Sequence, residues 1–176
     1  YRPTPGQPDY AAATVRHEFA PTLIAALRSD ALRRGVSLYS LLLSGVGVLL
    51  ARLSGQSDFA VAAPFAGLAL AGNQALMGDG VSSLPLRMQL EPGLAWGDWV
   101  DRTHATVLDA MMHREATLTD IQRMLGLRAQ NGEAALTGVT FNLLPESTVA
   151  SFDGLAHEVQ EFPRVAMDLY LCFNLS

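Results

Sequence analysis

The feature that most constrains this chain is a long apolar run in its first third. The leucines and valines that follow Ser37 leave almost no polar face: Leu38, Leu41, Leu42, Leu43, Val46, Val48, Leu49 and Leu50. A serine hydroxyl in this position accepts a hydrogen bond from a free amide of the first helical turn. The pattern therefore predicts a helix that begins after Ser37 and is buried on most sides within a protein core.

Two properties of the run bear on its surroundings. A membrane span is disfavoured because the run extends for only about a dozen residues before Arg52, whereas a bilayer needs about 20. Gly45 and Gly47 each lower helix propensity by about 1 kcal/mol relative to alanine. We therefore expect another backbone to pack closely against the helix at both glycines.

The sequence after this helix predicts a tight turn and two strands. After the turn Ser54–Gln56, residues Asp58–Ala63 are small or apolar on both faces, which favours a strand inside a sheet over an edge strand. Pro64 is expected to end that strand, since proline has no amide proton to donate. Two glycines in Met77–Gly80 come just before a predicted strand, Val81–Leu90, and loops of this kind can approach a ligand.

The remaining pattern predicts helices and strands mixed along the chain. An amphipathic, half-exposed helix is predicted over Trp96–Met112 because apolar residues recur there at steps of three and four. A helix beginning at Pro21 and ending at Gly35 has an apolar stripe of Leu23, Leu27 and Leu32. The other expected elements are a strand over Ala12–Phe19, a short helix over Thr119–Leu127, a loop over Gln130–Ala134 and strands over Thr137–Leu144, Leu155–Glu161 and Asp168–Leu175.

Composition excludes several classes of function. The 176 residues are 49% hydrophobic, which fits one domain with a sizeable core. A net charge of -5 without a basic run disfavours a nucleic-acid partner, because phosphate binding needs clustered cations. The lone Cys172 cannot form an internal disulfide, and no signal segment opens the chain, so a cytoplasmic location is expected.

No histidine or serine stands in a catalytic or metal-binding pattern. A five-residue step turns a helix by about 500°, so His104 and Asp109 are expected on different sides of theirs. The pair His113 and Asp120 has no metal-ligand spacing, and His113 is interpreted as a residue at the end of a helix. The serines Ser40, Ser44, Ser82 and Ser83 lack the Gly-x-Ser-x-Gly setting of a nucleophile and are interpreted as structural hydroxyls.

Ordered segments of the chain resemble the condensation domains of nonribosomal peptide synthetases, within the chloramphenicol-acetyltransferase-like superfamily. Each segment alone is a modest signal, whereas the shared order makes the resemblance specific. His113 also follows the helix Trp96–Met112 in the register of a family motif. The resembling segments are Leu41–Gln56, Asp58–Leu68, Met77–Arg87, Gly138–Leu143 and Met167–Leu169.

The resemblance implies an α/β fold, a mixed-sheet two-layer sandwich lobe of the CoA-dependent acyltransferase type. The family's catalytic His-His-x-x-x-Asp-Gly motif lies in the N-terminal half of its domain, and none of the four histidines here fits it. We therefore expect residues 12–176 to be a C-terminal lobe trimmed at both ends, and the proline-rich residues 1–11 to be a crossover linker. The isolated chain is predicted to be inactive.

By the same resemblance, the full domain joins a carrier-bound acyl or peptidyl thioester to an acceptor amine. The expected partners are the N-terminal lobe, peptidyl carrier proteins and neighbouring synthetase domains; substrates travel on the carriers' phosphopantetheine, and no cofactor or metal is expected on this lobe. Arg87 and His113 are assigned structural roles. The expected tunnel wall is Gly78, Asp79, Gly80, Val81, Ser82 and Ser83, and the expected floor loop is Pro64, Phe65, Ala66 and Gly67.

Departures from the family pattern leave alternatives open. Small and polar residues at 79–83 stand where the family usually has two aromatic residues followed by Val-Asn-Thr, and most of the motif after His113 is lost. The alternatives are an epimerising or cyclising relative, or a non-catalytic docking or scaffold module. A free-standing acyltransferase that uses coenzyme A is less favoured, because the matches are to synthetase motifs.

Overall fold

The computed structural model describes residues 13–66, 81–127, 136–144 and 169–174. Helices and strands are mixed along the chain, as the sequence predicts, and the helix expected over residues 96–112 has those bounds. The elements are α1 (Pro21–Arg34), α2 (Leu38–Ser54), β1 (Asp58–Ala66), β2 (Val81–Gln89), α3 (Trp96–Met112), α4 (Leu118–Met124), β3 (Val139–Leu144) and β4 (Leu169–Asn174).

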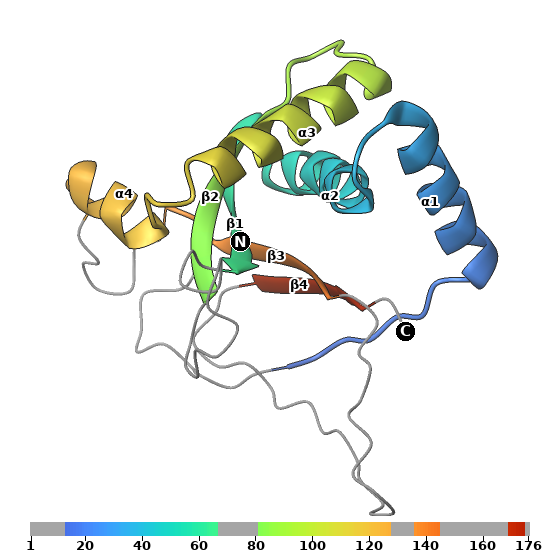
Figure 1. Ribbon diagram of the computed structural model, residues 1–176, viewed down its shortest axis with the longest axis horizontal. Coiled ribbons are helices and arrows are strands. Elements are labelled where there is room, and N and C mark those ends of the chain that lie inside the picture. The colour runs from blue at the N-terminus through green and yellow to red at the C-terminus, as the bar shows by residue number, and fades with distance from the viewer. Residues whose placement is uncertain (1–12, 67–80, 128–135, 145–168, 175–176) are drawn as a thin grey trace, which may run out of the picture.

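The four strands form one mixed sheet in the order β2-β1-β3-β4. β1 pairs with β2 in antiparallel fashion from Asp58↔Gln89 to Ala66↔Val81, and with β3 in parallel fashion at Ala62↔Thr140. β3 and β4 are parallel. β1 therefore lies inside the sheet, as predicted. Helices α1, α2 and α3 lie on one side of it (Figure 1), which confirms the expected α/β architecture of helices layered on a mixed sheet.

The core lies between α2, α3 and the sheet. Trp99 of α3 is 2% exposed and donates a hydrogen bond from Nε1 to the Ser44 carbonyl of α2 at 2.9 Å. This bond joins the two helices, because a buried indole N–H needs an acceptor. The buried residues of the main cluster are Leu43, Val46, Val61, Ala63, Leu86, Met88, Trp99, Val107 and Phe141.

The two glycines of α2 have different surroundings. A Cβ on Gly47 would lie 2.9 Å from both Met88 Cε and Trp99 Cζ2, so close packing is confirmed there, although side chains rather than a backbone make the approach. A Cβ on Gly45 would meet nothing within 4 Å, so the prediction was wrong for that residue. The difference arises because α3 and β2 pack on one side of α2 only.

Burial of α2 is also less complete than the apolar run predicts. Its buried residues all fall between Ser40 and Gly47. Beyond them, Leu49 is 52% exposed and Leu53 is 75% exposed. Composition alone therefore overestimated the buried surface, because the last turns of α2 extend past the part that α3 covers.

Two predictions about the first third need correction. Leu32 is 83% exposed while Ala31 is 3% exposed, because a four-residue step from Leu27 stays on one helix face and a five-residue step leaves it. Residues 13–19 form no strand and are exposed. Phe19 of this segment stacks on Phe173 of β4, with ring centroids 6.0 Å apart.

Pro64 does not end β1, which continues to Ala66. The pairing of β1 with β3 is recorded only at Ala62↔Thr140, whereas the pairing with β2 runs on through Pro64↔Ser83. Proline is tolerated where one side of a strand has no ladder to donate to, which is the situation at this end of β1.

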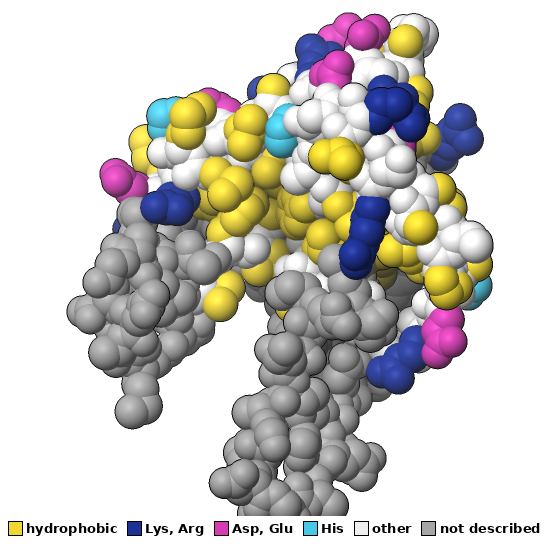
Figure 2. All heavy atoms as spheres, turned by 45° about the vertical axis from the view of Figure 1, so that its right-hand side comes forward, with side chains coloured by type: hydrophobic (Ala, Val, Ile, Leu, Met, Phe, Trp, Pro, Cys, Tyr) yellow, Lys and Arg dark blue, Asp and Glu magenta, His cyan; other side chains and the backbone are white. Residues whose placement is uncertain are grey.

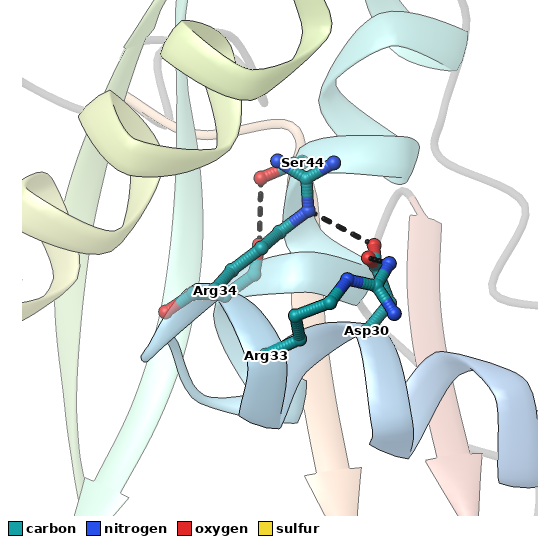
Figure 3. A network of polar contacts seen from close by, with 5 residues as sticks. Asp30, Arg33, Arg34 and Ser44 are labelled. Atoms are coloured by element: carbon teal, nitrogen blue, oxygen red, sulfur yellow. Dashed lines mark hydrogen bonds and ion pairs between the residues drawn. The ribbon is translucent and has the colours of Figure 1, made fainter.

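Local hydrogen bonds fix the ends of the helices. Ser37 accepts from the Ser40 amide at 3.0 Å, as predicted, and Gly35 ends α1 with a positive φ of 70°. Figure 3 shows Arg33 and Arg34 both reaching Asp30 on α1, and the Ser44 hydroxyl bonding back to the Ser40 carbonyl within α2. These contacts lie within the last turns of α1 and the first turns of α2.

The short helix α4 begins at Leu118 and ends at Met124, which places both its ends earlier than expected. Its start is set by Thr117 and Asp120, each of which bonds the backbone of the other in a capping box. The linker expected over residues 1–11, the loop over 130–134 and the strand over 155–161 lie outside the described residues. In the described ranges, no single helix has the length and hydropathy of a membrane span, although α1 and α2 together, bent by 107°, pass that test.

Candidate functional site

The end of the β1–β2 hairpin brings together the two segments predicted to line a tunnel. Pro64 lies opposite Ser83, Phe65 opposite Ser82, and Ala66 opposite Val81. The predicted floor and wall are therefore neighbours across one ladder, and the floor residues 64–66 belong to a strand instead of a loop. The other predicted members, Gly67, Gly78, Asp79 and Gly80, lie outside the described residues.

The two faces of this hairpin end differ in chemistry. Side chains alternate along a strand, so Phe65 and Ser82 share the helix side with the buried Val61, Ala63 and Leu84. Pro64 and Ser83 project from the opposite side. Val81 at the tip is 61% exposed. The hairpin end thus carries a serine on each face, Ser82 beside the aromatic ring of Phe65 and Ser83 beside Pro64.

A row of aromatic rings continues from Phe65 across the helix side of the sheet. Tyr39 of α2 lies between Phe65 and Phe141, with ring centroids 6.1 Å and 5.0 Å away. Phe173 follows Phe141 at 5.6 Å, and Phe19 follows Phe173. The row links the hairpin end with β3, β4 and the segment before α1. Spacing in the sequence gives no sign of it, because its members come from five separate segments.

Arg87 lies at the other end of the hairpin, about 13 Å from Ser83 at the usual rise per strand residue. It donates two hydrogen bonds to the Asp58 carboxylate, from Nε at 2.9 Å and from an Nη at 2.7 Å, and Gln89 adds a third at 3.3 Å. The bond from Arg87 lowers the pKa of Asp58, and the same bond raises the pKa of Arg87. The structure thus engages Arg87 in an exposed ion pair on the sheet.

His113 is the C-cap residue of α3, and its amide donates to the Asp109 carbonyl at 3.1 Å. Its ring is 76% exposed and lies 3.7 Å from the Asp109 carboxylate one helical turn earlier. The predicted position at a helix end is therefore observed. His113 and Arg87 are held by separate partners, and the structure gathers neither with the tunnel residues.

His104 is engaged in a contact that the sequence did not reveal. Its Nδ1 lies 3.0 Å from the Ser40 hydroxyl, and that hydroxyl lies 2.8 Å from the Ser37 hydroxyl. The contact between Ser40 and His104 joins α2 to α3. Because Ser40 is 0% exposed, it is closed to a substrate. The three-residue spacing of Ser37 and Ser40 could have indicated that their hydroxyls meet. It could not indicate the contact of Ser40 with His104, which is 64 residues further along the chain.

Two other surface features are candidates for binding. An apolar groove of about 480 Å³ lies between the end of α2, the loop after β2 and the start of α3, with Arg52, Glu91, Trp96 and Trp99 among its lining residues. Figure 2 shows hydrophobic side chains gathered in a hollow at the centre of one face, with most charged side chains around its edge. The described ranges contain no cluster of residues suited to a metal ion.

The sequence is similar to one protein family and to several peptide synthetases. A family model described as "Condensation domain" matches residues 2–164. The chain is 30% identical over 114 residues to phosphinothricin tripeptide synthetase PhsC of Streptomyces viridochromogenes, a match that covers 65% of this chain and 10% of that protein. It is 28% identical over 138 residues to bacitracin synthase 2 of Bacillus licheniformis, covering 78% of this chain and 5% of that protein.

Solved structures agree in fold. The first condensation domain of the calcium-dependent antibiotic synthetase superposes with a TM-score of 0.68 at 25% identity, covering 87% of this chain and 34% of that one. The X-domain from teicoplanin biosynthesis, in its complex with OxyB, superposes with a TM-score of 0.69 at 19% identity, covering 82% of this chain and 32% of that one. The chain spans about a third of each of these structures and a tenth or less of these two synthetases.

Proposed function

Because this chain belongs to the condensation-domain family of nonribosomal peptide synthetases, we propose that it is one lobe of a domain that joins a carrier-bound acyl or peptidyl thioester to an acceptor amine. The observation that carries the proposal is the family match over residues 2–164. The hairpin end supports it, since Pro64–Ala66 and Val81–Ser83 lie opposite one another in one ladder.

The proposed chemistry divides between two lobes. In the reaction, the amine nitrogen attacks the thioester carbonyl, the carbon–sulfur bond breaks, and the carrier thiol leaves with a proton. The two described histidines of α3 are engaged elsewhere, His104 with Ser40 and His113 beside Asp109. In the family, the histidine that handles the amine proton lies in the N-terminal half of the domain, so we assign this role to the other lobe. This lobe contributes by positioning, which supplies up to about 7–11 kcal/mol when two reactants are well aligned.

The proposed partners follow from the surface and the family. The hydrophobic hollow in Figure 2 is a surface of the kind that another lobe covers, because exposed apolar patches mark interaction sites. Peptidyl carrier proteins would deliver substrates on phosphopantetheine to the tunnel between the lobes, and neighbouring synthetase domains would flank it. A cytoplasmic location remains part of the proposal.

The test compares two proteins in one assay. The chain alone and a chain extended upstream to include a second lobe are each mixed with an acyl-loaded donor carrier and an aminoacyl-loaded acceptor carrier. Mass spectrometry of the acceptor carrier reads out the product. We expect product from the extended chain and none from the isolated lobe. Product from the isolated lobe would refute the division of labour, and no product from an extended chain with an intact His-His-x-x-x-Asp-Gly motif would refute the reaction.

A non-catalytic docking module is the second candidate. It is favoured by the fold shared with the teicoplanin X-domain, whose structure was determined in complex with another protein, OxyB. It is also favoured by Asp79 and Gly80, which stand where the family usually has two aromatic residues. The two candidates differ in one observation, because a docking module predicts that the lobe encoded upstream lacks the histidine motif.

A further inference from the structure

The apolar groove between the end of α2, the loop after β2 and the start of α3 has walls that are held in place. The Leu90 amide donates a hydrogen bond to the Ser57 carbonyl at 2.8 Å, which ties the loop after β2 to the segment after α2. Gly55 and Gly93, both with a positive φ, form turns in the lining. Trp99 fixes α3 to α2 through its indole hydrogen bond. A groove with such walls is pre-organised, so binding costs little entropy for ordering it.

The lining of the groove includes an aromatic ring that is open to solvent. Trp96, the first residue of α3, is 44% exposed, whereas Trp99 is 2% exposed. An exposed tryptophan leaves a large apolar area in contact with water. The volume of the groove, about 480 Å³, is enough for a bulky side chain of another molecule. The apolar side chains beside Trp96 in the lining include Val48, Leu90, Pro92 and Leu94.

The charged side chains of the lining are Arg52 and Glu91. Glu91 is already neutralised, because its carboxylate accepts a hydrogen bond from Arg102 at 2.8 Å. Arg52 is exposed and makes no hydrogen bond or ion pair within the part of the chain that the structure describes. The groove therefore presents an uncompensated positive charge beside an apolar wall, although the whole chain carries a net charge of -5.

Apolar surface continues beyond the groove along α2. Leu49 is three residues before Arg52, so the two side chains are neighbours on the helix surface, and Leu49 is 52% exposed. A small molecule in the groove would leave Leu49 in water, whereas a protein that covers Arg52 covers this leucine as well. Tryptophan and arginine are also enriched among the residues that dominate binding energy at protein interfaces. These features favour a protein as the occupant.

We propose that the apolar groove is a docking site for a segment of a partner protein, which places an apolar side chain against Trp96 and a carboxylate at Arg52. Charge complementarity selects an acidic segment, because a guanidinium can bind a carboxylate through two parallel hydrogen bonds. Docking at this groove goes beyond the proposed function, since it requires neither the condensation reaction nor a catalytic histidine.

The test measures peptide binding to the extended two-lobed domain by isothermal titration calorimetry. Three short peptides of equal length are compared: one with a phenylalanine between glutamates, one with glutamine in place of each glutamate, and one with alanine in place of the phenylalanine. We expect the glutamate peptide to bind and the alanine peptide not to bind. The glutamine peptide should bind about three- to fivefold more weakly, as expected for the loss of an exposed ion pair.

Variants of the groove and a matched control locate the binding. Arg52→Gln should lower the affinity for the glutamate peptide to that for the glutamine peptide. Trp96→Ala should lower it by about thirtyfold or more, as at the centre of an interface. Arg28→Gln should leave it unchanged, because Arg28 is exposed on α1 outside the lining and is also unpaired in the described part of the chain. Thermal unfolding checks that each variant folds, and Arg52→Gln decides the test if Trp96→Ala does not.

Several results would overturn the proposal. The glutamate peptide could fail to bind at millimolar concentration, or Arg28→Gln and Arg52→Gln could lower its affinity equally, which would report on net charge alone. Phenylacetate that binds as tightly as the peptide would assign the groove to a small ligand. A dimer of the extended domain that Trp96→Ala disperses in sedimentation would assign it to a second copy. Peptide binding by the isolated chain but not by the extended domain would assign it to the other lobe. Because no substrate is present, none of these results depends on whether the extended domain catalyses condensation.

Discussion

The two sides of α2 contrast sharply although they have similar compositions. The inner side carries Ser40, Leu43 and Gly47, which are buried against α3 and the sheet. The outer side carries Gly45 and Leu49, which are exposed. Residue type alone therefore does not tell which side is inside. The position of Trp99 determines which side of α2 is buried, because its ring lies against Gly47 and its N–H donates a hydrogen bond to the Ser44 carbonyl.

Replacement of the residue that defines the inner side should have the largest effect. Trp99→Ala removes a ring that is 2% exposed together with its bond to the Ser44 carbonyl, so we expect the free energy of unfolding to fall by about 3–5 kcal/mol. Urea unfolding followed by circular dichroism measures it. A loss below about 1 kcal/mol would mean that Trp99 does not hold α2 and α3 together.

Gly47→Ala tests the inner side by adding an atom instead of removing many. The new methyl group would meet Met88 and Trp99 at 2.9 Å; the end of Met88 can move aside, but the Trp99 ring is fixed by its hydrogen bond. We expect a loss of about 1–3 kcal/mol in the free energy of unfolding, as for overpacked cores. An unchanged urea midpoint would contradict the close approach.

Gly45→Ala is the matched control on the outer side. Its methyl group meets nothing within 4 Å, so only helix propensity changes, and we expect a gain of about 0.5–1 kcal/mol. The same urea titration measures it. If both glycine variants shift the midpoint in the same direction, the contrast between the two sides of α2 is wrong.

An exposed ion pair extends the comparison to the sheet surface, where the smallest effect is expected. Arg87→Gln removes the partner that lowers the pKa of Asp58. Because that pKa is lower in the folded state, the pair contributes stability above the ordinary aspartate pKa of about 3.9 and loses it as the pH falls through the lowered value. The difference in urea midpoint between Arg87→Gln and the unmodified chain should be small near neutral pH and vanish once the pH is below the lowered pKa of Asp58. A difference that persists in acid would indicate lost packing.

The sequence predicted elements better than it predicted contacts. The helix α3 and the interior position of β1 could be read from periodicity and from side-chain size, because both are local properties. The correct choice between Gly45 and Gly47 could not, since it depends on Trp99 more than 50 residues away. The bond from Ser40 to His104 is non-local for the same reason.

The candidate site was predictable in one respect and not in another. The order of the family motifs predicted that Pro64–Ala66 and Val81–Ser83 line the same tunnel. The antiparallel pairing of β1 with β2 makes these two segments neighbours. Pro64 was misread as a strand end, because the rule that proline interrupts a ladder depends on which neighbours the strand has. The contacts of Tyr39 with Phe65 and Phe141 could not be predicted, because they join residues that are far apart in the sequence.

The mixed pairing of β1 also sets an order of assembly. Its antiparallel partner β2 follows within one hairpin, whereas its parallel contact with Thr140 closes a far longer stretch of chain. Local pairings form sooner than distant ones, because closing a longer loop costs more entropy. During synthesis, the nascent hairpin would thus leave the ribosome with one bare edge on β1, a template for wrong partners until β3 arrives.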